Sequence, residues 1–376
     1  MLKQVIFNNI KNIWGWKTAR KILVISVDDY GNVRLDSKEA REKMNQAGLK
    51  IRSRFDALDA METKEDLEIL FDALTSVKDK NGRNAVFTPF ALPCNIDFEK
   101  IASENYRKYE YELLPTTFKK LSEKDTLAYD GTWNLWKEGI EKGIMIPQFH
   151  GREHLNVKVL EEKLANKDVE VLTALRNRSY TSISNSGYST INYTAAFDFW
   201  DSSENVDLRK ILIDGLHQFR NAFGYKASHF MPPTSKIHES HLSVLKEEGI
   251  NYIDTNLIHS QHQGLGNYAK SYNFTGKKLK SGQINIVRNV VFEPTDVRGF
   301  DWVNYSLKQI EAAFCWRRPA IISSHRVNFC GYIDPNNRKI GIDALKELLK
   351  KVVKKWPDVE FMSANELGDL ISKTKS

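Results

Sequence analysis

Two adjacent carboxylates near the start of the chain could perform metal or acid–base chemistry. Asp28 and Asp29 directly follow the apolar run of residues 21–27. Neighbouring carboxylates repel each other unless a cation compensates their charge, and a metal ion is one cation that does so. We therefore expect one of the two to bind a metal and the other to act as a base, although Asp is also common in turns and helix caps.

Two histidines form a second group of possible metal ligands. His150 and His154 are four residues apart in QFHGREHLN, a spacing that predicts two imidazoles on one face of a helical turn. Two imidazoles and one carboxylate make a three-ligand site with open positions, which is typical of catalytic zinc. With Asp29 they predict a divalent metal site for Zn²⁺, and the same ligands also suit Co²⁺, Ni²⁺ or Fe²⁺.

A third histidine, His325, ends the apolar run PAIISS. A histidine at the end of a buried strand can be a hydrogen-bonded core residue. Because its ordinary pKa lies near neutrality, it can also be a general acid. Beside a metal site, the second interpretation is favoured.

The segments that must position these residues alternate between two patterns. Short apolar runs predict strands over residues 21–28, 85–92, 143–149, 226–231, 251–255, 284–292, 319–324 and 359–362. Helical periodicity predicts helices over residues 37–47, 64–78, 207–223, 239–248, 305–316, 341–355 and 364–373. Near-continuous apolar strands separated by helices are typical of a parallel sheet covered by helices.

Seven or eight such units favour a (β/α) barrel of parallel strands, in which functional residues gather at the carboxyl ends of the strands. We expect one domain over residues 21–376, with residues 1–20 forming an amphipathic segment packed on it. Residues 177–205 are polar and aromatic without periodicity, which predicts an elaborated loop region. Its aromatic side chains could stack on sugars or simply pack.

The three groups and their order resemble the polysaccharide deacetylase family, the metal-dependent carbohydrate esterases of the glycoside hydrolase/deacetylase superfamily. The family pattern is Asp-Asp-Gly after the first strand, His-Ser/Thr-x-x-His, Arg-x-Pro-x-Gly, Asp-x-x-Asp, and Leu-Leu-His near the end. VDDYG, HGREH and ISSH match the first, second and last parts, with one residue inserted before the first glycine and Gly151 in place of Ser/Thr. The resemblance implies a distorted (β/α)7 barrel.

The resemblance also implies a role for each matching residue. Asp28 would be the general base that activates water, and Asp29, His150 and His154 would bind the metal. His325 would protonate the leaving amine, and a backbone N–H would stabilise the oxyanion. The implied activity is metal-dependent removal of an N- or O-acetyl group from a carbohydrate or sugar precursor.

One departure from the family pattern concerns the arginine that orients the catalytic base. Arg-x-Pro-x-Gly corresponds to MPPTS at residues 231–235, so Met231 stands where the family has this arginine. We expect a nearby cationic side chain to replace it, the candidates being His229, Arg152 and Arg326.

Two further assignments rest on weaker matches. The resemblance points to the backbone N–H of Thr234 as the oxyanion donor, although the glycine of the same motif is missing here. Asp254, in NYIDTN, matches the later Asp motif, and we expect it to hold the imidazolium of His325.

Two other functions remain open. HGREH is also an H-x-x-E-H string, which is typical of inverted-zincin peptidases and would make Glu153 the general base. That motif belongs within a helix, and it leaves Asp28, Asp29 and His325 unexplained. Alternatively, loss of the family arginine could mark a pseudo-deacetylase that binds metal and carbohydrate without turnover.

The composition limits the partners and the cellular compartment that we expect for this protein. The net charge of +7 arises from 55 basic and 48 acidic residues that are interspersed, so we expect no nucleic-acid partner. No apolar run reaches the ~20 residues of a membrane span, and the N-terminus lacks the pattern of a signal peptide. Three widely spaced cysteines suit a reducing compartment. We expect a cytoplasmic protein.

Overall fold

The structure, a computed structural model, describes residues 2–184 and 191–374. Within these residues the main sheet has nine strands, all paired in parallel, in the order β10-β7-β6-β5-β2-β1-β12-β11, with β13 paired to the first half of β1. Its strands are β1 (Lys21–Tyr30), β2 (Phe87–Ala91), β5 (Gln148–Phe149), β6 (His229–Phe230), β7 (Tyr252–Asp254), β10 (Ile284–Ile286), β11 (Val290–Val291), β12 (Ala320–His325) and β13 (Val359–Met362).

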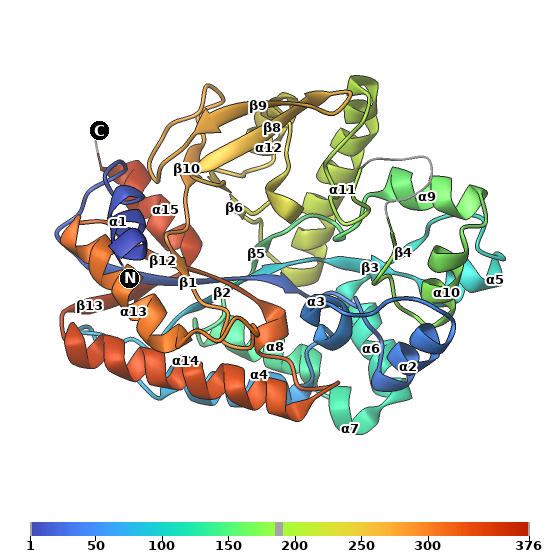
Figure 1. Cartoon of the computed structure of the whole chain (residues 1–376), viewed down its shortest axis with the longest axis horizontal. Coiled ribbons are helices and arrows are strands. Elements are labelled where there is room, and N and C mark those ends of the chain that lie inside the picture. Colours follow the sequence, from blue (N-terminus) through green and yellow to red (C-terminus); the bar gives the residue numbers. More distant parts are fainter. Residues whose placement is uncertain (1, 185–190, 375–376) are drawn as a thin grey trace.

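Helices follow most of the strands. They are α1 (Leu2–Ile10), α2 (Lys38–Gln46), α3 (Arg54–Leu58), α4 (Lys64–Thr75), α5 (Phe98–Ser103), α6 (Leu114–Lys124), α7 (Thr126–Tyr129), α8 (Thr132–Glu141), α9 (Val157–Ala165), α10 (Val169–Arg176), α11 (Asn205–Phe223), α12 (Leu242–Glu247), α13 (Trp302–Cys315), α14 (Pro335–Lys355) and α15 (Ala364–Lys373). The long helices α14 and α4 run along one side of the sheet (Figure 1).

The two ends of the sheet belong to one continuous segment. β10 pairs with β7 at one end, and β11, which begins four residues after β10 ends, pairs with β12 at the other. The sheet therefore curves back on itself and forms a distorted (β/α) barrel, as the alternation of strands and helices predicted. The predicted strand at residues 284–292 is divided into β10 and β11 because its two halves pair with different strands, β7 and β12.

Side chains on the strands alternate between two apolar clusters. In β1, Leu23, Ile25 and Val27 belong to the large cluster beneath the outer helices, whereas Ile22 and Val24 belong to a smaller cluster inside the sheet. α15 contributes Ala364, Leu367 and Ile371 to this inner cluster. Because strand side chains alternate with a period of two, every second residue of each strand points to the interior.

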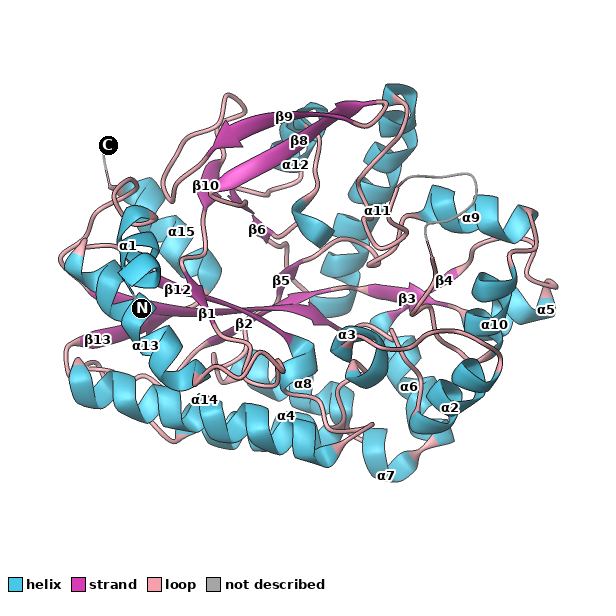
Figure 2. Cartoon of the chain, in the orientation of Figure 1, coloured by secondary structure: helices cyan, strands magenta, loops and turns pink. Residues whose placement is uncertain are grey.

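Most predicted elements are present with shifted ends, and several elements are additional. The predicted ranges 359–362 and 364–373 coincide with β13 and α15. Five helices between residues 114 and 176 were not predicted (α6 to α10), nor were two antiparallel strand pairs, β3 (Cys94–Ile96) with β4 (Tyr111–Leu113) and β8 (Ile258–Gly264) with β9 (Asn267–Tyr272). Figure 2 shows the β8–β9 hairpin on the side of the sheet opposite α14 and α4.

The N-terminal segment packs through polar residues. α1 contacts α13, and Asn8 and Asn12 are buried, whereas Ile10 and Trp14 of the predicted apolar face are 47% and 63% exposed. The guanidinium of Arg318 donates to the carbonyls of residues 12, 13 and 15. Hydrogen bonds from Arg318 to the backbone therefore help to hold residues 12–15 on the domain.

The aromatic residues of the long segment at 177–205 are mostly part of the core. Tyr180, Tyr193, Phe197 and Phe199 are each less than 7% exposed, and Trp200 is 41% exposed. Tyr188 lies outside the described residues. Packing, the alternative to sugar stacking, therefore accounts for four of them. Across the described residues, the helices include none with the length and apolar character needed to cross a bilayer.

Candidate metal and acid–base site

A bulge at the end of β1 brings both of its carboxylates to one site. Val27 pairs with Pro89 and Tyr30 with Ala91, so β1 has one extra residue between these pairs. Asp28 shares the interior face with Ile22 and Val24, and simple alternation would turn Asp29 away. Asp29 instead adopts a left-handed conformation with φ of 75°, which redirects its side chain. Such strain in a residue other than glycine is typical of functional sites.

His150 and His154 come from the end of β5 and the irregular loop that follows. Residues 150–154 form no helical turn, and Gly151 has φ of 103°. A Cβ at Gly151 would lie 3.2 Å from Phe197 and 3.3 Å from Pro233, so glycine allows the close approach of these side chains. The predicted helical turn is wrong, but both imidazoles still face Asp29.

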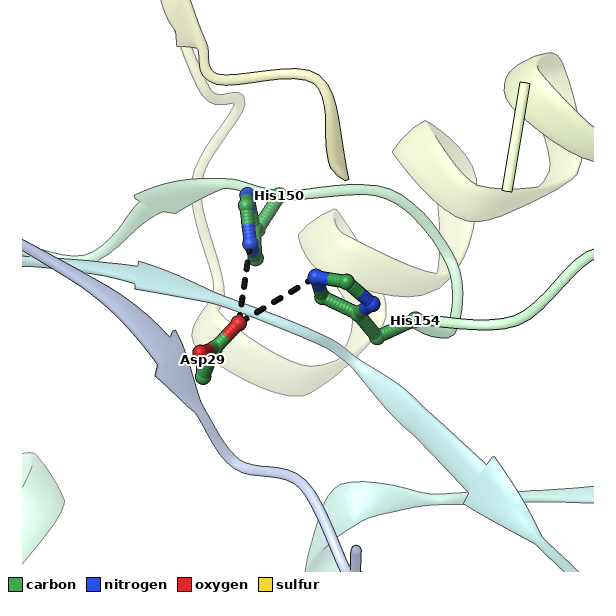
Figure 3. A group of neighbouring side chains, drawn as sticks. All are labelled: Asp29, His150 and His154. Atoms are coloured by element: carbon green, nitrogen blue, oxygen red, sulfur yellow. Dashed lines mark hydrogen bonds and ion pairs between the residues drawn. The ribbon is translucent and has the colours of Figure 1, made fainter. Parts of the chain in front are cut away.

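The three predicted metal ligands meet in the structure. One Asp29 carboxylate oxygen lies 3.3 Å from Nε2 of His150 and 3.2 Å from Nε2 of His154 (Figure 3). All three side chains are buried, and one ligand atom from each lies within 4.8 Å of the others. The donor set of two imidazoles and one carboxylate, with positions left open, fits a catalytic divalent metal.

The protonation of the two imidazoles also suits a metal. Nδ1 of His150 lies 2.7 Å from the carbonyl oxygen of Met231, so it carries the proton and leaves the Nε2 lone pair directed toward Asp29. Burial lowers the pKa of His154 to about 4, against the opposing charge of Asp29. His154 is therefore neutral at pH 7, as a metal ligand must be.

Arg288 holds the neighbouring carboxylate, Asp28. Its two terminal nitrogens each donate to one carboxylate oxygen of Asp28, both at 2.8 Å. The guanidinium also lies over the ring of Phe90, with its carbon 4.8 Å from the ring centre. A two-pronged bond of this kind fixes both the position and the plane of a carboxylate.

Asp254 belongs to the same ion-pair group. Nε of Arg288 donates to Asp254 at 2.8 Å, and the other oxygen of Asp254 lies 3.3 Å from Nε2 of His229. Burial would raise the pKa of Asp254, but the charge of Arg288 lowers it below its usual value. Asp254 therefore contacts the arginine that holds Asp28, and not His325 as expected from the sequence.

The carboxylate beside His325 is Glu293, which the sequence did not indicate. Nδ1 of His325 lies 2.6 Å from Glu293, and Glu293 also accepts from Asn328 at 2.8 Å and pairs with Arg54. Burial alone would lower the pKa of His325, but the charge and hydrogen bond of Glu293 raise it to about 9. His325 is therefore protonated at pH 7.

The candidates for the missing arginine lie elsewhere. Arg152 donates two hydrogen bonds to Glu153 and a third to Asp214. Arg326 is buried between the carboxylates of Asp59 and Glu62. His229 contacts Asp254 alone among the acidic groups, within the described part of the chain. Arg288, which these candidates omitted, is the cation on Asp28.

Two consecutive residues after β6 are strained. Thr234 has φ of 54° and Ser235 has φ of 57°, a conformation that is rare for a β-branched residue such as threonine. The N–H of Ser235 donates to Pro232. Among the described residues no acceptor is found for the N–H of Thr234, which remains free to donate to a ligand.

The alternation of side chains along the predicted strand at 284–292 could have indicated Arg288. Arg288 lies two and four residues after the interior side chains Ile286 and Ile284, so this alternation places it in the interior with Asp28. An arginine at an interior position needs a buried partner. Glu293 lacks such a signal, because the interruption between β10 and β11 changes the alternation before it.

We expect Asp29→Ala and His154→Ala each to reduce bound metal to less than about a tenth of one ion per chain, because each removes one of three ligands. Elemental analysis after loading with Zn²⁺ measures this. Glu153→Gln is the matched control, because Glu153 lies in the same loop but is held by Arg152, and it should keep its metal. Metal retained in Asp29→Ala but lost in His154→Ala would instead support the inverted-zincin site, in which Asp29 is not a ligand.

We expect the imidazole of His325 to titrate near pH 9 in the metal-free wild type. Glu293→Gln removes the largest of the charges that raise this pKa, so we expect the titration to move to lower pH, where burial opposes the imidazolium and only Asp29 and Asp28 still favour it. NMR of the imidazole protons measures both values. His217, which is exposed on α11, provides the internal control, and an unchanged His325 titration in Glu293→Gln would contradict the assigned pairing.

No protein-family model and no curated protein matches the sequence. A solved structure assigned as a glycoside hydrolase/deacetylase from Parabacteroides distasonis has a TM-score of 0.51 and 12% identity, covering 96% of this chain and 73% of that chain. One assigned as a polysaccharide deacetylase from Mycobacterium smegmatis has a TM-score of 0.48 and 10% identity over 96% and 93%.

PuuE allantoinase has a TM-score of 0.45 and 10% identity over 94% of this chain and 91% of that chain. At these identities the similarity concerns the fold. The fold of this chain is thus similar to that of the Parabacteroides structure, and a distorted (β/α) barrel is what the resemblance of the sequence motifs implied.

Proposed function

We propose that the protein is a metal-dependent hydrolase that removes an acetyl group from a carbohydrate, most simply from an N-acetylated sugar. One observation carries this proposal: two oppositely charged acid–base groups stand beside a buried set of metal ligands. Asp28 and His325 are register partners on adjacent parallel strands, so their backbones are about 4.8 Å apart. Each has its own counter-charge, Arg288 and Glu293 respectively.

Asp29, His150 and His154 would hold the metal. When bound, the ion would polarise the substrate carbonyl and make water more acidic. Asp28 takes the proton from the attacking water, because each carboxylate oxygen keeps a lone pair beyond its bond to Arg288. The water oxygen then bonds to the carbonyl carbon.

His325, protonated at pH 7, donates its proton to the leaving nitrogen as the C–N bond breaks. For an ester the same proton goes to the leaving oxygen. Glu293 stabilises the imidazolium beforehand, and the free N–H of Thr234 is the candidate donor to the oxyanion. Acetate and the free amine leave, after which Asp28 releases its proton and His325 regains one from solvent.

The neighbouring structures and the rival functions bear on this choice. The Parabacteroides protein with this fold is assigned as a glycoside hydrolase/deacetylase, which supports a carbohydrate substrate. Arg288 donates to both oxygens of Asp28, as the arginine missing at Met231 would, and this contact argues against a pseudo-deacetylase. Glu153 accepts two hydrogen bonds from Arg152. It is therefore poorly placed to act as the general base of an inverted zincin.

We expect Asp28→Asn and His325→Ala each to lower kcat for acetate release by about 10²- to 10⁴-fold, the usual contribution of a general base or acid. The substrate is screened among N-acetylated sugars with the metal-loaded wild type. Metal content should stay near that of wild type, because neither residue is a ligand. Full activity in Asp28→Asn would exclude this mechanism.

We expect Arg288→Lys to lower kcat more than it changes KM, because a lysine cannot form the two-pronged bond that orients Asp28. Arg298→Lys, which changes an exposed arginine near the same end of the barrel, is the control and should retain activity. Equal activity in both variants would show that the orientation of Asp28 does not limit the reaction.

If Arg288→Lys is poorly folded, the double variant Asp254→Asn/Arg288→Lys keeps one buried cation for one buried anion. We expect this variant to regain stability without regaining activity. Thermal unfolding and acetate release, measured on the same preparation, separate the two effects.

A further inference from the structure

Helix α1 and the turn that follows it are docked on the domain with their polar side inward. They lie at one end of the molecule, where α1 contacts α13 (Figure 1). Asn8 and Asn12 are 4% and 1% exposed, whereas Phe7 and Trp14 are 61% and 63% exposed. A helix on the surface of a domain normally buries its apolar side. The orientation of this segment is therefore the reverse of the one that burial of apolar surface would select.

The exposed apolar side chains share one side of the segment. Ile10 lies four residues after Ile6 and three after Phe7, and both spacings place helical side chains on the same face. Trp14 follows four residues after Ile10, and each of the four is at least 47% exposed. Ile6, Phe7, Ile10 and Trp14 are called the outer face of α1 below. A contiguous apolar surface of this kind is typical of a docking site.

Hydrogen bonds to the barrel fix the outward orientation. Asn289, between β10 and β11, donates to the side chain of Asn12 at 2.8 Å, and Lys11 donates to Gln309 on α13 at 2.7 Å. Arg318, just before β12, donates to three backbone carbonyls of the segment. Asn289 and Arg318 are buried. Turning the outer face inward would leave these buried groups without partners, which is costly.

Two aromatic side chains from other parts of the chain extend the outer face. Phe274 borders the same small hollow as Trp14 and is 36% exposed. The indole N–H of Trp316 donates to the side chain of Asn9 at 2.9 Å, and Trp316 is 37% exposed. Tryptophan has an apolar ring and one polar N–H, so it favours the boundary between an apolar and an aqueous phase.

The chain segments around the outer face carry no negative side chain. They are residues 1–20, 270–292 and 316–319, and none of them contains Asp or Glu. Backbone bonds join them, because the N–H of Trp16 donates to residue 275 and the N–H of Thr18 donates to residue 317. Segments far apart in the sequence thus combine into one acid-free surface.

Several cations on this surface have no counter-charge. Lys17, Lys278, Lys280 and Arg317 are exposed, and within the described residues their side chains form no ion pair. Arg20, at the border of the surface, is by contrast bonded to Glu360. The free cations are therefore available to an anionic partner.

An anionic lipid surface matches these features better than a second copy of the chain. A symmetric dimer would bring the same basic surface against itself, and like charges repel each other. Lipid headgroups instead compensate the lysines and the arginine, while apolar side chains enter the boundary with the acyl chains. Both halves of the surface, apolar and basic, then have a partner.

We infer that the outer face of α1, with the basic side chains around it, binds the surface of a membrane that contains anionic lipids. The helix lies along the interface, with Phe7 and Trp14 inserted and Lys17 and Arg317 at the headgroups. This inference goes beyond the proposed hydrolysis and does not depend on it, because the surface includes no metal ligand and no acid–base residue.

The test measures sedimentation of the whole chain with lipid vesicles. One set of vesicles is phosphatidylcholine alone, and the other is equal parts of phosphatidylcholine and anionic phosphatidylglycerol. Phe7→Ser/Trp14→Ser removes the two most exposed side chains of the outer face. Leu127→Ser/Val169→Ser is the matched control, because these side chains are 96% and 74% exposed on other helices. Thermal unfolding of every variant verifies that it is folded.

We expect the wild type to bind the anionic vesicles at least about tenfold more tightly than the neutral ones. Phe7→Ser/Trp14→Ser should weaken binding to anionic vesicles by at least about tenfold, because two aromatic rings no longer leave water. Leu127→Ser/Val169→Ser should bind within about twofold of wild type. Added salt should weaken binding, because it screens the cations from the headgroups.

A second pair of variants tests the charges. Lys17→Gln/Arg317→Gln should weaken binding to the anionic vesicles about tenfold and leave neutral vesicles unaffected. Lys119→Gln/Lys137→Gln, which removes two exposed lysines from α6 and α8, is the control with the same change in net charge and should bind as wild type does.

Three results would overturn the inference. The first is no binding to anionic vesicles, and the second is equal binding to both kinds of vesicle. The third is binding that Phe7→Ser/Trp14→Ser leaves unchanged in a folded protein. A chain that binds no vesicle but forms a dimer, which Phe7→Ser/Trp14→Ser converts to a monomer, would assign the outer face to contact between copies instead.

Discussion

The bond between Arg288 and Asp28 joins the two parts of the molecule on which the site depends. Asp28 ends the central strand β1, and Arg288 lies in the interruption where β10 gives way to β11 and the sheet closes. Both side chains are less than a tenth exposed. A buried charge without a partner is costly, and breaking such a pair typically costs about 3–5 kcal/mol. The pair therefore links closure of the barrel to placement of the carboxylate.

Separate counter-charges allow an acid and a base to stand side by side. Asp28 would otherwise pair directly with the imidazolium of His325 on the adjacent strand, which would occupy both groups. Arg288 compensates the carboxylate and Glu293 compensates the imidazole. Each group can then keep the protonation state that hydrolysis requires. The metal ligands form a third group, in which burial keeps His154 neutral.

Charge compensation also extends to the space beside the site. Asp254 contacts Arg288 on one side and borders a hollow beneath the β8–β9 hairpin on the other. The charge of Asp254 is therefore already compensated by Arg288. The backbone is strained at Asp29 and at Thr234. Strain of this kind persists only where the surrounding structure holds it.

The sequence by itself determined the barrel and most of the metal site. Apolar runs and helical periodicity are local, so the strands at residues 21–28, 319–324 and 359–362 could be predicted, and with them the strand ends that carry Asp28 and His325. Asp29, His150 and His154 could be predicted as a group because few side chains bind divalent metals. Only the tertiary structure decided which charges meet: Arg288 is on Asp28, Glu293 is on His325, and Asp254 is on neither His325 nor the metal ligands. These ion pairs join residues 32, 34 and 260 positions apart, and their partners follow from strand order and register, which no local pattern contains. The left-handed turn at Asp29, the loop that replaced the expected helical turn at His150, and the inward polar side of α1 were decided in the same way.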